Sequence, residues 1–188
     1  MKRLIFALAL ATMLCAGHNS YAQSAITNLA QQGNWSTDTY TIVGAHSTAE
    51  NPDIITNCSA STTIHQTTFM IGTSDAGNNF FNLSNSAWSL PLHATGPVTI
   101  IVNGHTRTYQ STALETLSVN VSLTRNQLIS LVWDMELASS MQVKVGSLPP
   151  LTISLDGSRT TLAAMMNWAN LPDLASGTGS DDDSSSSN

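Results

Sequence analysis

The chain has 188 residues, of which 41% are hydrophobic and only 10% are charged, and its six basic residues stand against twelve acidic ones. This length suits one ordinary domain with a single hydrophobic core. A net charge of −6 with so few cations cannot neutralise a run of phosphates, which excludes nucleic acid as a partner and argues against docking on anionic lipid.

Residues 1–22 have the three zones of an export signal. A positive start at Lys2 and Arg3 is followed by an almost unbroken apolar stretch, and Ser20 and Ala22 are the small residues expected before a cleavage site. The apolar stretch is short for a bilayer span, and no later segment approaches the roughly 18 apolar residues that a span needs. We therefore expect a signal peptide, no membrane span after its cleavage, and a periplasmic or secreted bacterial protein. Loss of the two cations leaves four basic and twelve acidic residues, a net charge of −8.

Cysteine usage excludes an internal disulfide in the mature chain. Cys15 leaves with the signal, so Cys58 is the only cysteine that remains. A lone cysteine outside the cytoplasm is either buried and inert or free to pair with another chain. Burial is favoured because Cys58 follows the apolar pair Ile54-Ile55.

The first part of the mature chain predicts a leader followed by strands. Residues 23–33 are rich in Gln, Ser, Ala and Asn, which indicates a flexible leader with one helical turn at most. From Trp35 onward, short β-branched and aromatic runs alternate with Gly, Asn, Pro and Ser, the pattern of strands and turns. Strands are expected over residues 35–43, 54–64, 67–73 and 80–83.

The clearest local signal is a hairpin over residues 97–109. Asn103-Gly104 stands between two runs, and this dipeptide tolerates the positive φ angles that a two-residue hairpin turn requires. Residues 114–123 alternate between apolar and polar, which predicts a half-buried antiparallel strand.

The pattern then changes to helical spacing. Thr124 and Gln127 form a capping box, and apolar residues recur every three or four positions until about residue 137. Two further strands and a last helix are expected over residues 141–145, 151–155 and 159–168.

Together these elements predict a mainly β fold, an antiparallel β-sandwich over residues 34–170 with two late α-helices that cover an edge or an end of it. The strand–helix alternation of a parallel sheet is missing from the sequence. Residues 171–188 contain too little apolar surface to offset the entropy of ordering, so they predict a disordered acidic and serine-rich tail.

Five features follow the signal peptide in this order: Trp35, Cys58, the dipeptide Leu90-Pro91, the Asn103-Gly104 turn, and a closing segment over residues 153–164. In this order they resemble the invasion-associated locus B family of exported alphaproteobacterial proteins. The resemblance covers roughly residues 34–170, and it implies a β-sandwich with no known catalytic centre and a role at the cell surface or in host contact. Such proteins carry further cysteines, one of them where this chain has Asn167-Trp168, so the family's disulfide is not implied here.

The sequence offers no motif for catalysis or for metal binding. The mature chain has four histidines, His46, His65, His93 and His105. None stands at a spacing that places two metal ligands on one face of a helix or strand, and serine-nucleophile motifs and glycine-rich phosphate loops are missing. Asp134 and Glu136 are two apart on a predicted helix and so face different directions. We therefore expect no catalytic residue, no metal and no cofactor.

The tryptophans are the best candidates for binding, because an exposed indole can stack on a sugar or a peptide group. Core packing is the expectation for most of them. Trp88 is the exception, since it stands in a polar stretch between strands, over residues 85–89. The predicted ligand-binding residues are Trp88 and Asn85, with Asn103 at the hairpin tip, and the expected partner is a protein or a glycan.

Three functions are compatible with these patterns. The leading interpretation is an exported, non-enzymatic binding protein of the bacterial periplasm or cell surface. One alternative is a periplasmic hydrolase whose site assembles from distant residues around a histidine such as His105 or His65. The other is a structural envelope or assembly protein, since Ser- and Thr-rich strands resemble surfaces that pair at sheet edges.

Overall fold

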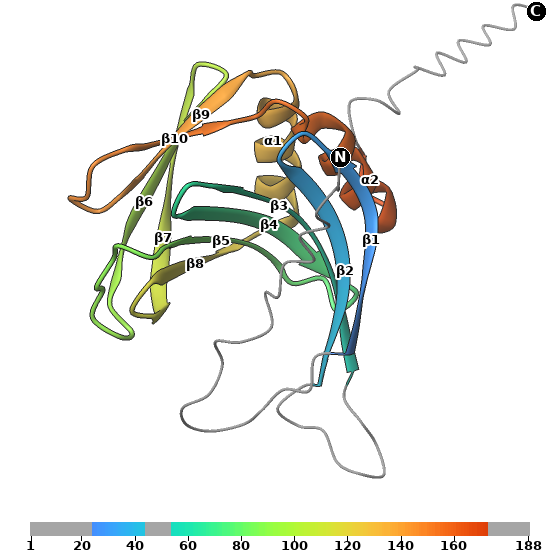
Figure 1. Ribbon diagram of the computed structural model, residues 1–188, viewed down its shortest axis with the longest axis horizontal. Helices are drawn as coiled ribbons and strands as arrows, with labels where there is room; N and C mark the ends of the chain where they lie inside the picture. Colours follow the sequence, from blue (N-terminus) through green and yellow to red (C-terminus); the bar gives the residue numbers. More distant parts are fainter. Residues whose placement is uncertain (1–23, 44–53, 173–188) are drawn as a thin grey trace, which may run out of the picture.

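The computed structural model describes residues 24–43 and 54–172 of the chain. Ten antiparallel strands and two late helices make up this part (Figure 1), which confirms the predicted mainly β fold class. The strands are β1 (Ser24–Gln32), β2 (Trp35–Val43), β3 (Ile54–Ile64), β4 (Thr67–Ser74), β5 (Asn79–Asn85), β6 (Thr95–Val102), β7 (His105–Glu115), β8 (Ser118–Leu123), β9 (Ser140–Val145) and β10 (Leu151–Ser154). The helices are α1 (Arg125–Glu136) and α2 (Ser158–Trp168).

All ten strands belong to one sheet with the order β1-β2-β3-β4-β5-β8-β7-β6-β9-β10. Strands joined by short turns are neighbours, as hairpins require. The β6–β7–β8 meander runs back toward β5, so β8 pairs with β5 and β6 is left to pair with β9. The sheet bends strongly, and its last strand returns across the turn between β3 and β4 (Figure 1).

One face of the bent sheet carries the core. Side chains alternate between the two faces of a strand, and the buried positions of β5 follow this period of two, whereas the last four residues of β4 are all buried. Four aromatic rings form a row across this face, with centroids 5.5–6.3 Å apart from one ring to the next: Trp35, Phe69, Phe81 and Tyr109. Each large apolar side chain buried in this way contributes about 1.5–3 kcal/mol to folding.

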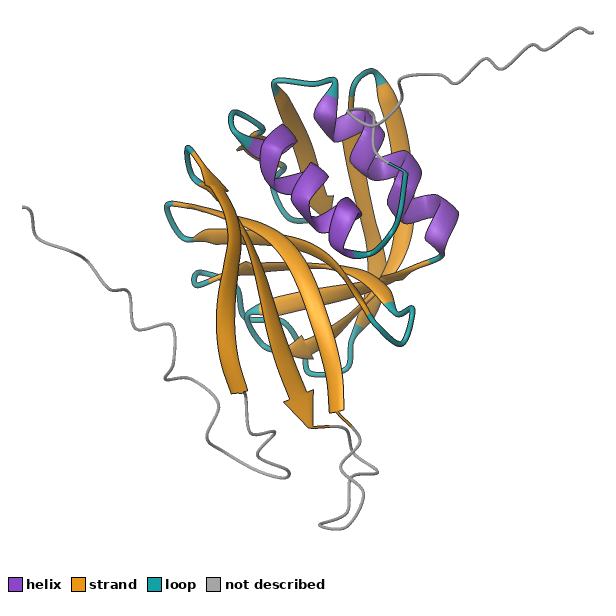
Figure 2. Cartoon of the chain, turned by 90° about the vertical axis from the view of Figure 1, so that its right-hand side faces the viewer, coloured by secondary structure: helices purple, strands orange, loops and turns teal. Residues whose placement is uncertain are grey.

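The helices lie side by side at one end of the molecule (Figure 2). The predicted capping box starts α1: the Thr124 hydroxyl accepts from the Gln127 backbone N–H at 3.2 Å, and the Gln127 side chain accepts from the Thr124 backbone N–H at 2.8 Å. Its buried residues, Leu128 and Leu131 among them, point into the core. α2 packs against β1, β2 and β3, so the helices cover the core face that the bend leaves open.

The segment that joins β10 to α2 is fixed against the β1–β2 hairpin. The Trp35 indole Nε1 donates to the Ser154 carbonyl at 3.0 Å, and the Thr37 hydroxyl donates to the Thr161 carbonyl. Gly157, at φ +85°, comes so close to β1 that a Cβ there would lie 2.3 Å from the Gln32 carbonyl oxygen. These contacts fix the position of β10 relative to β2 and β3, with which it shares no strand pairing.

The structure differs from two sequence expectations. Where a flexible leader is expected over residues 23–33, Ser24–Gln32 forms β1, because pairing with β2 compensates for a weak local preference. The strand expected over 114–123 begins only at Ser118, since β7 extends to Glu115 and a turn follows it. The predicted signal peptide and the tail from residue 173 lie outside the described residues.

Candidate functional site

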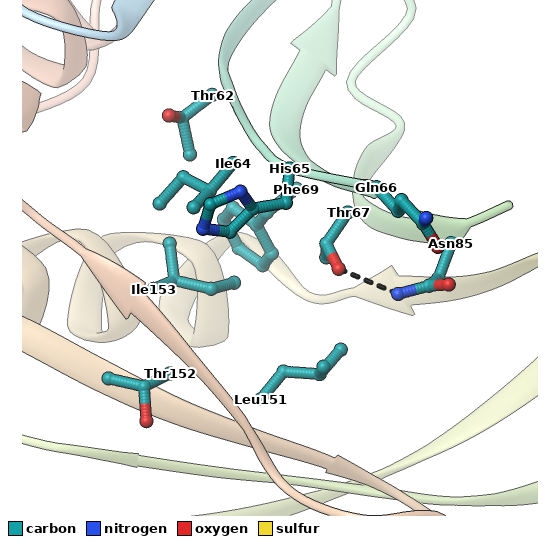
Figure 3. A pocket seen from close by; sticks show the side chains of 10 residues that line it. All are labelled: Thr62, Ile64, His65, Gln66, Thr67, Phe69, Asn85, Leu151, Thr152 and Ile153. Carbon is teal, nitrogen blue, oxygen red and sulfur yellow. Dashed lines mark hydrogen bonds between the residues drawn. The ribbon is translucent and has the colours of Figure 1, made fainter. Parts of the chain in front are cut away.

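A cavity of about 320 Å³ lies where β10 returns across the β3–β4 hairpin (Figure 3). Its lining comes from the hairpin, from the end of β5 and from β10: Thr62, Ile64, His65, Gln66, Thr67, Phe69, Asn85, Leu151, Thr152 and Ile153. The cavity exists because β10 and the hairpin face each other without strand pairing, so side chains rather than backbone hydrogen bonds fill the gap.

The floor of this cavity is apolar. Phe69 and Ile153 are buried, and Ile64 and Leu151 are half-buried against the core. Ile64 and Phe69 lie on the core face of the hairpin because Ile64 pairs with Thr67 and Thr62 pairs with Phe69 in its register. An apolar floor of this kind favours the binding of apolar groups, because binding removes apolar surface from water.

Polar groups form the rim. His65 and Gln66 make the two-residue turn, and His65 has a φ of +54°, a left-handed conformation that costs a residue with a Cβ about 1 kcal/mol or more. The Asn85 amide donates to the Thr67 hydroxyl at 2.8 Å, which leaves the Thr67 hydroxyl proton for another acceptor. The Thr62 hydroxyl is buried and has no hydrogen-bond partner among the described residues.

The cavity lining contains one imidazole and no other ionisable side chain. Its lining contains no Asp, Glu, Lys or Arg, and His65 is its only titratable side chain. No carboxylate or thiol stands beside His65 in this lining, so the lining lacks the acidic partner that would orient the imidazole as a general base. What this arrangement can do chemically is hold a neutral, largely apolar group.

The structure separates the three predicted binding residues. Asn85 lines the cavity, and its side-chain carbonyl also accepts from the Ala87 N–H at 2.8 Å, so it shapes the loop that follows β5. Trp88 lies in that loop, half-buried against the core and outside the cavity lining. Asn103 is exposed in the turn between β6 and β7. The loop with Trp88 contacts the turn at the opposite end of β7, at Thr116 and Leu117. An eleven-residue strand spans about 33 Å, so Asn103 lies far from this loop.

Sequence reasoning missed most of the cavity. His65-Gln66 could have been found, because the strands predicted over 54–64 and 67–73 leave two residues for a hairpin turn. The opposing residues Leu151 and Ile153 could not, because only the bend of the sheet brings β10 to this turn.

A second polar cluster joins β7 to α1. Asp134 is buried, with only 8% of its side chain exposed. One of its oxygens accepts from the Arg107 guanidinium, with Nε at 3.0 Å, and the other lies 2.8 Å from the His105 Nδ1. Arg107 also donates to the Ser130 hydroxyl at 2.7 Å. Burial alone raises the pKa of Asp134, but the hydrogen bonds from Arg107 and His105 outweigh it and hold this pKa below its ordinary value.

The ionised Asp134 determines which imidazole nitrogen carries a proton. A carboxylate can only accept, so the His105 Nδ1 must donate to it, and in the neutral ring Nε2 is then a free acceptor. The His105 side chain is 61% exposed. This is the carboxylate–imidazole arrangement that orients a general base, although Arg107 neutralises the carboxylate.

The remaining candidates lie apart from one another. His65 and His93 are exposed in different turns, His105 is exposed at the start of β7, and His46 lies outside the described residues. Across residues 24–43 and 54–172, no three His, Cys, Asp or Glu side chains come close enough together to hold a metal ion. Cys58 is fully buried, and burial together with the nearby Asp38 raises the pKa of its thiol to about 12, so it has little thiolate character.

A larger hollow of about 560 Å³ lies between the β4–β5 turn and the end of α2. The polar side chains that the β4–β5 turn contributes to it are already engaged, while Arg125, at the start of α1, also lines it. The Asp75 carboxylate accepts from the Thr56 N–H at 3.2 Å, and the Ser74 hydroxyl accepts from the Asn78 N–H at 3.0 Å. The Thr73 hydroxyl donates to the side-chain oxygen of Asn79 at 2.7 Å. This hollow is therefore a weaker candidate for ligand binding than the cavity under β10.

Comparison with protein-family models, curated proteins and solved structures finds no match to this chain. Neither α1 nor α2, the helices of the described part, is long and apolar enough to span a membrane.

Proposed function

We propose that the chain is an exported, non-enzymatic binding protein that holds a neutral, largely apolar group in the cavity between the β3–β4 hairpin and β10. The observation that carries the proposal is the cavity itself, with its apolar floor, its polar rim and its volume of about 320 Å³. Ligand pockets have this construction and begin at about this size. Export to the periplasm or the medium rests on residues 1–22, and a role at the bacterial surface or in host contact rests on the resemblance to the invasion-associated locus B family.

The cavity limits the affinity of a small ligand. A benzene ring fills an apolar cavity of about 150 Å³, so this one holds a ring with a substituent. Burying one such group yields about 1.5–3 kcal/mol, which corresponds to a dissociation constant of millimolar or weaker. A biological ligand must therefore make further contacts at the rim.

Toluene is the probe that tests the cavity, and the methyl resonances of Ile64 and Ile153 report its binding by NMR. Thr67→Phe places a ring in the cavity and should abolish the shifts. Thr68→Phe is the matched control, because Thr68 is the next residue of β4 and points to the opposite face, where its hydroxyl lies 2.9 Å from that of Thr63. Thr67→Val removes the hydroxyl without filling the space and should retain toluene.

The proposal fails if toluene leaves both isoleucine methyls unmoved, or if Thr67→Phe and Thr68→Phe bind it equally well. Equal circular dichroism spectra of the two variants establish that both are folded before they are compared.

A hydrolase centred on His105 is the second candidate, and the 2.8 Å contact between its Nδ1 and Asp134 favours it. An exposed imidazole held by a carboxylate can act as a general base toward water or a substrate hydroxyl. Hydrolysis of p-nitrophenyl esters tests it, with His105→Gln set against His93→Gln, an exposed histidine elsewhere on the surface. Activity that His105→Gln abolishes and His93→Gln retains would establish this candidate, and equal activity in both would exclude it.

A further inference from the structure

The cavity borders a sheet edge with free backbone groups. In an antiparallel strand the N–H and C=O of one residue point to one side, and those of the next residue point to the other. The Leu155 N–H donates to the Ser139 carbonyl at 2.9 Å, on the β9 side, whereas the Ser154 carbonyl accepts from Trp35 on the opposite side. The Thr152 N–H and C=O therefore point away from β9, toward the hairpin.

Thr152 faces the cavity with its backbone. Its side chain is exposed and projects away from the other lining residues in Figure 3, yet Thr152 is part of the lining. In the described part of the chain, no backbone hydrogen bond outside the strand pairings engages its N–H or C=O. One donor and one acceptor of β10 are thus available at the mouth of an apolar cavity.

The free edge is short. On one side of Thr152 the Ser154 carbonyl is already bonded to Trp35, and on the other side Pro150 has no N–H to donate. Only about three residues of an added strand can pair here, so the edge accepts a short extended segment rather than a long strand.

We propose that the ligand of this site is a short, uncharged, extended peptide segment that pairs with Thr152 at the free edge of β10 and places an apolar side chain in the cavity. This rests on the proposed function, and it names the class of ligand. The residue opposite Thr152 exchanges two hydrogen bonds with it and points its own side chain to solvent. The side chains of the two peptide residues that flank it point to the core face, where they contact Ile64 and Phe69. Main-chain pairing supplies affinity and the cavity supplies selectivity, which is how strand addition recognises peptides.

The uncharged rim excludes other peptide classes. With no Asp, Glu, Lys or Arg in the lining, a charged side chain would lose its hydration at the cavity without gaining a partner. The sequence pattern that fits is apolar–polar–apolar.

The test uses the capped peptide acetyl-Ser-Leu-Thr-Leu-Ser-amide. Binding should shift the Thr152 amide resonance and slow its hydrogen exchange, because that N–H becomes bonded. Methylating the backbone nitrogen of the central threonine removes the donor to the Thr152 carbonyl and should weaken binding about tenfold, the value of one hydrogen bond. Methylating the nitrogen of a flanking leucine is the control, because that N–H points away from β10, and it should change the affinity less than twofold.

A variant of the protein tests the second hydrogen bond of this pair, the one that the Thr152 N–H donates to the peptide. Thr152→Pro removes the free N–H but no hydrogen bond to β9, so it should weaken the unmodified peptide at least tenfold. Equal affinity of the two methylated peptides would overturn the inference, whether or not this variant folds. Toluene binding without peptide binding would refute peptide recognition and leave the proposed function standing, and failure of both probes would refute both.

Discussion

The contact of Arg107 with Asp134 should hold α1 against β7, and replacing Arg107 tests this. Arg107→Met keeps the apolar stem but leaves the Asp134 carboxylate, 8% exposed, without its guanidinium partner. Breaking a buried ion pair costs about 3–5 kcal/mol. Because His105 still bonds one carboxylate oxygen and Arg107 is only partly buried, we expect the free energy of unfolding to fall by about 2–3 kcal/mol, at or below the lower end of that range.

Urea unfolding followed by circular dichroism measures this loss as a change in midpoint at constant slope. Adding Asp134→Asn removes the buried charge, so the double variant should be more stable than Arg107→Met alone, with a coupling energy of about 1–2 kcal/mol. His105→Gln should cost less than about 1 kcal/mol because this side chain is exposed. The reasoning is refuted if Arg107→Met costs no more than His105→Gln, or if the double variant is the least stable of the three.

Three further outcomes are expected, each from one structural feature. The pKa of Asp134 is lowered in the folded chain, so the ionised carboxylate contributes fully to stability above the ordinary Asp pKa. This contribution is lost as the pH falls through the pKa of the folded state, and the urea midpoints of the wild type and Arg107→Met should therefore converge in acid. Tyr109→Phe should stabilise the chain by about 1 kcal/mol, because the buried Tyr109 hydroxyl has no partner in the described structure, and a lower melting temperature would contradict this. Gly157→Ala should destabilise by about 3 kcal/mol or more, since it combines a positive φ with a Cβ 2.3 Å from the Gln32 carbonyl oxygen, and an unchanged melting temperature would contradict the close approach.

Local patterns were sufficient to predict most strands and both helices. β2 and β3 have the predicted bounds, Trp35–Val43 and Ile54–Ile64, because runs of β-branched residues bounded by turn residues carry the signal within the element. The capping box at Thr124 marks the start of α1 for the same reason, since its hydrogen bonds span three residues.

Features that depend on distant contacts could not be predicted. Ser24–Gln32 has no strong preference of its own, and it is a strand because β2 offers a pairing edge. Alternation in residues 114–123 indicates which side chains share a face but not where the turn before Ser118 lies.

The candidate site shows the same division. Asn85 was predicted as a binding residue and lines the cavity, whereas Asn103 was grouped with it and lies at the other end of β7. Hydrophobic patterning does not determine how far a sheet bends, so neither the return of β10 to His65 nor the pairing of His105 with Asp134 could be derived from the sequence.

The central claim is that the cavity between the hairpin and β10 binds an apolar group. A crystal of the chain soaked with iodobenzene tests it most directly, because anomalous scattering locates the iodine without any assumption about the site. We predict one strong iodine peak between Phe69 and Ile153, beneath the His65 turn. A peak in the hollow beside Trp168, or no ordered iodine at all, would contradict the account.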